Sequence, residues 1–224
     1  MIFLVGVEDS QIKMEQYFIA IDFETAGGDH RKNGFIELGA SLWNLTKCQK
    51  VSEFSMFSNM EGFTWDERCL NEFWLKNKEN YERCLKGMKE SRYNCFQVVQ
   101  FFKEWVLEVT KDKPNVYFIG DCVNFDYAIL RFFYDGDFSY ILGRYTEVFS
   151  MDSFFYAFSG RVISNGLLDE SSKETFKTAF RNRTSIDYWE DSPFKHTHAA
   201  LDDANYMAWF WCQSQKCIAL NFIQ

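Results

Sequence analysis

Two stretches near opposite ends of the chain carry acids and histidines that could bind metal ions or transfer protons. The first, IAIDFET, ends an apolar run with Asp22 and Glu24. Residues two apart in a β-strand point to the same face, so both carboxylates would project together. Such a pair is costly in a packed region unless cations neutralise it, and carboxylate oxygens suit Mg²⁺ or Mn²⁺. The pair predicts a divalent-metal site, and the alternative is a strand end with solvated acids.

The second stretch, KHTHAALDDANYMAW, holds His196 and His198 and the adjacent acids Asp202 and Asp203. On a helix, with about 100° between residues, Asp203 falls inside the apolar stripe and Asp202 lies on its flank. A carboxylate inside a packed face needs a partner, and a metal shared with the first acid pair would supply one. The alternative, stabilisation by the helix dipole, suits Asp202 better.

A third stretch, GDCVNFDYAIL, offers Asp121 and Asp126 after an apolar run. An acid near a helix start is common on its own, so Asp126 gains weight only beside the other two stretches. We expect Asp126 near the beginning of a helix that follows a strand.

The acids are expected to lie on strands and helices that follow one another in a mixed order. Apolar runs predict strands at 17–25, 35–44, 50–59, 115–121 and 147–155. Helical patterns predict a helix opened by Thr64 and carrying Phe73, Trp74 and Tyr81, and further helices at 96–109, 125–134, 173–183 and from 198 onward. This order predicts an α/β fold of the ribonuclease-H-like type, a central mixed five-stranded sheet flanked by helices. A dinucleotide-binding fold is disfavoured because no G-x-G-x-x-G follows the first strand.

Length and composition favour one compact intracellular domain. The 224 residues contain no linker or repeat, so we expect a single domain at 17–224, with 1–16 as an N-terminal arm or extra strand. No apolar run is long enough to predict a transmembrane helix, so no membrane partner is expected. Seven cysteines without a C-x-x-C pair fit a reduced, cytoplasmic chain.

The net charge of −8 disfavours binding of duplex nucleic acid by bulk electrostatics. It does not disfavour an enzyme, because a site built from carboxylates adds negative charge that bound cations offset.

The three stretches together resemble the DEDDh family of 3′–5′ exonucleases, also called DnaQ-like, which has the ribonuclease-H-like fold. DFET resembles the first motif of that family, NFDYAIL the second and HAALDD the third. The motifs occur in the family's order and span residues 22 to 203, most of the chain.

The resemblance implies a two-metal mechanism. Asp22, Glu24, Asp126 and Asp203 would hold two Mg²⁺ or Mn²⁺ ions, one activating a water and the other stabilising the leaving 3′ oxygen. His198 would act as the general base, a role that suits a group titrating near neutrality.

Two further details bear on the resemblance to that family. The DEDDy branch has a tyrosine four residues before the last acid, whereas this chain has Ala199 there and His198 one residue earlier. Many members carry Asn four residues before the second-motif acid, whereas this chain has Cys122, which argues against a close tie to polymerase proofreading domains.

The family also implies contacts to the substrate. EFWLKN resembles an aromatic helix of exonucleases of the T-even phage exonuclease A and RNase AS type, which makes Trp74 or Phe73 a candidate to stack on a base, at about 1–3 kcal/mol per base. The alternative is that both rings belong to the core. Thr25 would touch the 3′-terminal nucleotide.

A basic row at helical spacing follows later in the chain, at Lys173, Lys177 and Arg181. It would either track a phosphate backbone or form a solvated helix face.

The leading hypothesis is a metal-dependent 3′–5′ exonuclease that acts on 3′ ends of single-stranded DNA or RNA and releases nucleoside 5′-monophosphates. One alternative is a nucleic-acid-binding module on the same fold with little activity, and another is an endonuclease of the ribonuclease H class. The choice between DNA and RNA and the formation of a homodimer stay open at this point.

Overall fold

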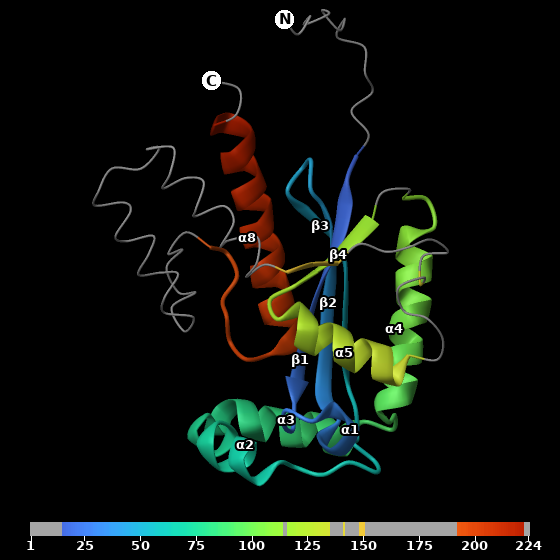
Figure 1. Cartoon of the computed structure of the whole chain (residues 1–224), viewed down its shortest axis with the longest axis vertical. Coiled ribbons are helices and arrows are strands. Elements are labelled where there is room, and N and C mark those ends of the chain that lie inside the picture. Colours follow the sequence, from blue (N-terminus) through green and yellow to red (C-terminus); the bar gives the residue numbers. More distant parts are fainter. Residues whose placement is uncertain (1–14, 114–115, 135–140, 142–147, 151–191, 222–224) are drawn as a thin grey trace, which may run out of the picture.

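The computed structural model describes residues 15–113, 116–134, 141, 148–150 and 192–221 (Figure 1). The strands are β1 (Tyr17–Thr25), β2 (Phe35–Asn44), β3 (Gln49–Phe57), β4 (Val116–Gly120) and β5 (Val148–Ser150). The helices are α1 (His30–Asn33), α2 (Glu67–Glu72), the 3₁₀ turn η1 (Trp74–Lys76), α3 (Lys78–Glu90), α4 (Cys95–Thr110), α5 (Val123–Phe133) and α8 (Ala200–Asn221).

The five strands form one mixed sheet in the order β3-β2-β1-β4-β5. The first three strands pair antiparallel, and β4 pairs parallel with both β1 and β5. Helix α8 lies along one face of the sheet, and α4 and α5 lie on the other (Figure 1). This is the mixed five-stranded sheet flanked by helices that the sequence predicts, and the fold class is confirmed.

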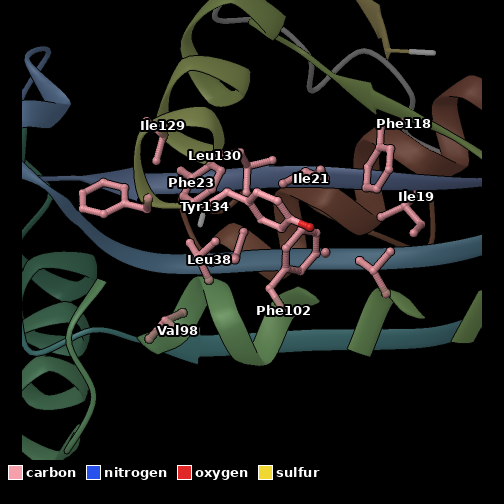
Figure 2. Close-up of a cluster of buried hydrophobic side chains, with 14 of the residues drawn as sticks. Ile19, Ile21, Phe23, Leu38, Val98, Phe102, Phe118, Ile129, Leu130 and Tyr134 are labelled. Atoms are coloured by element: carbon pink, nitrogen blue, oxygen red, sulfur yellow. The ribbon is translucent and has the colours of Figure 1, made fainter. Parts of the chain in front are cut away.

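The central strand β1 divides its side chains between the two faces. Alternate residues enter the core beneath α4 and α5, as Figure 2 shows for Ile19, Ile21 and Phe23. The residues between them, Phe18 and Ala20, pack against α8. Because this alternation has a period of two, the next residues of the second set, at 22 and 24, also face α8.

Strand β1 also runs beyond its pairing with β4. The register with β4 ends at Ala20, whereas the register with β2 continues to Thr25 with an irregularity after Glu24. Helices α1, α2 and α3 gather at this end of β1 (Figure 1). The acids at 22 and 24 therefore lie on the part of β1 that β4 does not cover.

The helix predicted from Thr64 differs in the structure. Its N-cap is Asp66, whose side chain accepts a hydrogen bond from the Cys69 N–H at 2.7 Å, so the capping role predicted for Thr64 is wrong. The predicted single helix is also broken near Phe73 into α2, η1 and α3. At the break, the Trp74 indole N–H donates to the carbonyl of Thr25 at 3.0 Å, a tertiary contact that helical periodicity does not reveal.

Helix α1 was not predicted from the sequence, whereas the remaining described elements match their predicted positions within a few residues. Helix α4 begins with a capping box between Asn94 and Gln97, and β5 falls inside the strand predicted at 147–155. The helix predicted at 173–183, with its basic row, and residues 1–14 lie outside the described residues. Within the described part of the chain, no helix has the length and apolarity needed to cross a membrane.

Candidate active site

Three predicted acids converge between β1 and α8. One carboxylate oxygen from each of Asp22, Glu24 and Asp203 lies within 4.8 Å of the others. Glu24 and Asp203 are buried, with 7% and 6% of their surface exposed, and Asp22 is half-buried. The neighbouring Asp202 is exposed, so the prediction that Asp203 faces the sheet and Asp202 faces solvent is confirmed.

The fourth predicted acid, Asp126, lies buried in the first turn of α5. Burial, together with the nearby Asp121 carboxylate, raises the pKa of Asp126 to about 8. After burial, the charge of Asp126 is the largest cause that raises the pKa of Asp22 well above its ordinary value. Asp126 therefore belongs to the same electrostatic cluster.

The pKa values of the cluster show how crowded it is. Burial and the neighbouring carboxylate of Asp203 raise the pKa of Glu24 to about 8. Burial raises the pKa of Asp203 to about 6, although a hydrogen bond from the Thr197 N–H opposes the shift. Buried carboxylates that repel one another hold protons unless a cation replaces them. This all-oxygen donor set fits Mg²⁺ or Mn²⁺.

A glycine seats the first turn of α8 directly on the sheet. Gly39 of β2 is the register partner of Asp22, and a Cβ added at Gly39 would lie 2.1 Å from the carbonyl carbon of Ala200. A side chain there would push α8 away from β2. The absence of a side chain at this position thus brings Asp203 up to the acids of β1.

An ion pair between a buried acid and a half-buried arginine, which the sequence reasoning missed, lies beside the cluster. Glu37 stands opposite Glu24 in the β1–β2 register and is 3% exposed. Its Oε2 accepts hydrogen bonds from Arg83 Nη1 at 2.8 Å and from the Ala200 N–H at 3.2 Å. A lone acid inside the apolar run FIELGASLWN is the signal that could have identified Glu37, whereas no local pattern marks Arg83.

The predicted general base, His198, lies two residues before α8. Its ring contacts the Phe73 ring edge-on, with centroids 5.0 Å apart. Burial, followed by the charge of His196, lowers the pKa of His198, and Asp203 opposes this shift. The imidazole is therefore neutral near pH 7 and can accept a proton.

The motif spacing selects His198 and predicts that His196 points elsewhere, but in the structure His196 also lies beside Asp203. Its Nε2 lies 3.4 Å from Asp203 Oδ2, and its ring centroid is 4.7 Å from that of His198. The intervening Thr197 donates its backbone N–H to Asp203 Oδ1 at 2.8 Å. That bond folds the loop back over Asp203 and brings both histidines to the acid.

The predicted substrate contacts separate into one core residue and two residues near the surface. Trp74 is 1% exposed and packs on Trp65 and Phe73, which favours, for this residue, the alternative that its ring belongs to the core. Thr25 lies at the end of β1, half-buried.

Phe73 is half-buried and lies between the site and a neighbouring pocket. This pocket, of about 500 Å³, is lined by Phe73 together with Gly28, Asp29, Lys32, Asn33, Asp66, Arg68, Cys69 and Glu72. Phe73 remains the candidate for contact with a base.

Comparison with known structures supports the fold. Cell-death related nuclease 4 (CRN-4) matches with a TM-score of 0.60 and 13% identity, over 90% of this chain and 64% of that one. The nuclease domain of 3′hExo, a DEDDh family member bound to rAMP, matches with a TM-score of 0.54 and 13% identity, over 91% and 94% of the two chains. The E. coli ExoI–ssDNA complex matches with a TM-score of 0.61 and 10% identity, over 93% of this chain and 43% of that one.

At these identities, the structural likeness establishes the fold. The chain spans 64% of the length of CRN-4, so part of that relative has no counterpart here. Sequence comparison with curated proteins gives no match.

A match to the sequence model of a protein family shows which family the chain belongs to. The model described as the 3′–5′ exoribonuclease Rv2179c-like domain matches residues 17–215, which include every acid of the cluster and both histidines. The resemblance to DEDDh exonucleases is confirmed, while the nearer likeness to the phage exonuclease A type stays a prediction. The chain belongs to the Rv2179c-like family of 3′–5′ exoribonuclease domains.

Proposed function

We propose that this chain is a metal-dependent 3′–5′ exonuclease that hydrolyses single-stranded nucleic acid from its 3′ end and releases nucleoside 5′-monophosphates. The observation that carries the proposal is the convergence of Asp22, Glu24 and Asp203, with carboxylate oxygens within 4.8 Å of one another, beside a half-buried His198. Family membership supports the direction of cleavage.

The acids would hold two Mg²⁺ or Mn²⁺ ions. The ligands would be Asp22, Glu24, Asp126 and Asp203, whose raised pKa values mark them as carboxylates that lack a counter-charge. When bound there, the ions would supply positive charge for the attacking and leaving oxygens of the phosphodiester.

His198 would take the proton from the attacking water. The lowered pKa of His198 keeps the imidazole neutral near pH 7, and the Phe73 ring limits its rotation from one side. The proton acquired by His198 would then pass to solvent, and the leaving 3′ oxygen would take up a proton as the nucleoside 5′-monophosphate departs. His198 is thus the proposed base, and the four acids are the proposed ligands.

RNA is the first substrate to test, because the family description names an exoribonuclease. Among the structural neighbours, one is described as recognising a histone mRNA stem-loop and another is a complex with ssDNA, so both polymers belong in the assay. We place the 3′-terminal nucleotide near Thr25 and Phe73. Dimerisation stays a prediction that light scattering on the purified chain would test.

The decisive experiment uses 5′-labelled single strands of matched RNA and DNA with Mg²⁺ or Mn²⁺. Stepwise shortening from the 3′ end is expected, with circular single strands left intact and with no shortening by Asp22→Ala or His198→Ala. Cleavage of the circles would favour an endonuclease. No cleavage of any substrate, together with no heat of Mn²⁺ binding by calorimetry, would favour the binding module.

A further inference from the structure

Helix α3 holds the backbone of the segment that carries His198. Asn80 Nδ2 donates to the carbonyl of Thr197 at 2.7 Å, and Arg83 Nη2 donates to the carbonyl of His198 at 3.1 Å. Both donors lie more than a hundred positions before their acceptors in the chain. The loop that presents His198 is therefore held by tertiary hydrogen bonds from another element.

The conformation that these bonds hold is an uncommon one. His198 has φ of 57°, in the left-handed region that residues with a side chain seldom adopt. Such a conformation persists only where the surroundings determine it. The carbonyl of His198 itself is one of the two groups that α3 binds, so Arg83 acts on the residue that carries the strain.

Arg83 is itself fixed in place. Its guanidinium donates to Glu37 through Nη1 and to the His198 carbonyl through Nη2, and it lies over the Phe57 ring at 5.3 Å. Glu37 accepts from the Ala200 N–H with the same Oε2 that accepts from Arg83. The Arg83–Glu37 pair therefore hydrogen-bonds to the backbone on both sides of Ala199, at His198 and at Ala200. The planar fork of arginine reaches two acceptors at once, which a lysine ammonium in the same place would not reproduce.

We propose that Arg83, held by Glu37, is a positioning residue for His198, which it fixes in the left-handed conformation that aims the imidazole at the acid cluster. The Arg83 guanidinium donates to Glu37, to the Cys84 sulfur and to the His198 carbonyl, so it acts on His198 through the backbone. The inference rests on the proposed function, because it takes His198 as the general base.

Arg83→Lys is the test variant, because it keeps a positive charge opposite the buried Glu37 and removes the fork. Lys86→Met on the same helix is the matched control, since Lys86 is exposed and pairs with Glu90 on the same helix at 4.0 Å. The chain contains three histidines, so their ring signals can be assigned by NMR from single His→Gln variants. In Arg83→Lys, the His198 ring signal should move, while the His30 signal stays in place.

The NMR arm decides the positioning claim without any need for activity. If the His198 signal in Arg83→Lys coincides with that of the wild type, Arg83 does not position the ring and the proposal fails. Movement of all three histidine signals would indicate general loosening of the fold and would equally overturn it. Lys86→Met should leave all three in place.

The activity arm is a double-mutant cycle under single-turnover conditions. Arg83→Lys should lower kcat by about 10²-fold, with KM and calorimetric Mn²⁺ affinity close to wild type. In the His198→Ala background, Arg83→Lys should cause no further loss of the residual rate. If Arg83 acts only through His198, the effects of the two substitutions do not add. If Arg83→Lys lowers the rate in the His198→Ala background as much as in the wild type, or if it weakens Mn²⁺ binding, then Arg83 acts on the acid cluster and the proposal is overturned. If the wild type cleaves no substrate, the proposed function fails. The NMR comparison would still decide whether Arg83 positions His198.

Discussion

His196 Nε2 lies 3.4 Å from Asp203 Oδ2, with 34% of the His196 side chain exposed and 7% of the Asp203 side chain. The acid of α8 that faces the cluster is thus also in contact with a histidine that the proposed reaction does not use. We expect the two histidines of this loop to have different roles, and substitution of each tests this.

His196→Ala should lower kcat by about 10-fold, the smaller effect usual for a partner of a metal ligand. His198→Ala should lower it by about 10²–10⁴-fold, as expected for loss of a general base. Steady-state kinetics on a labelled single strand with saturating Mn²⁺ measures both. Equal losses in the two variants would contradict the assignment of the base to His198.

The metal-free protein should lose stability as the pH rises. Burial raises the pKa of Glu24 and of Asp126 to about 8 and that of Asp203 to about 6. In the unfolded chain these groups titrate near 4. Between those values the folded state binds more protons than the unfolded state, so the free energy of unfolding falls as the pH rises from about 4 to about 8. Urea denaturation in EDTA over this range measures the slope.

Two comparisons test the origin of that slope. Saturating Mn²⁺ should flatten it, because bound cations replace the protons, and Asp126→Asn in EDTA should make it shallower, because one titrating group is gone. If Asp126→Asn and the wild type show the same slope in EDTA, the buried acids do not control the pH dependence.

Gly39→Ala should destabilise the fold by about 1–3 kcal/mol or more, the usual cost of overpacking. Its Cβ would meet the backbone of Ala200 at 2.1 Å, and backbone yields less readily than a flexible side chain. Gly28→Ala is the control, because nothing lies within 4 Å of a Cβ at that position. Equal midpoints of urea unfolding for the two variants would show that α8 does not depend on close approach at Gly39.

Substitution of Trp74 should change the stability of the fold, whereas substitution of Phe73 should change substrate binding. Trp74→Ala should cost about 3–5 kcal/mol of stability, as for a large buried aromatic residue, and should be visible in urea unfolding. Phe73→Ala should raise KM by an amount equivalent to about 1–3 kcal/mol for a lost base contact, and should unfold close to wild type. Unchanged KM in Phe73→Ala would remove that residue from the substrate site.

Local geometry explains how much of the site could be predicted from the sequence. The alternation of a strand places Asp22 and Glu24 on one face, and the helical period distinguishes Asp203 from Asp202. Both arguments require only residues close together in the chain, and the structure confirms both arrangements. The positions of the strands along the chain were predictable for the same reason, since each strand has its own apolar run.

The missed features depend on residues far apart in the chain. Arg83 and Glu37 are 46 positions apart, and the carbonyl that Arg83 binds is 115 positions away from it. No short sequence pattern can therefore reveal these contacts. The conformation of the loop at 196–199 follows from hydrogen bonds to Asp203 and α3. Burial of Trp74 likewise follows from its bond to β1, which helical spacing does not encode.

The seating of α8 on Gly39 has a consequence for how this protein could change over many generations. The separation of Asp203 from the acids of β1 is determined by one backbone meeting another, so the apolar side chains around them can be exchanged without altering that separation. In a randomised library selected for cleavage, the core positions of α8 such as Met207 and Trp211 should accept several apolar types. Position 39 should return glycine alone.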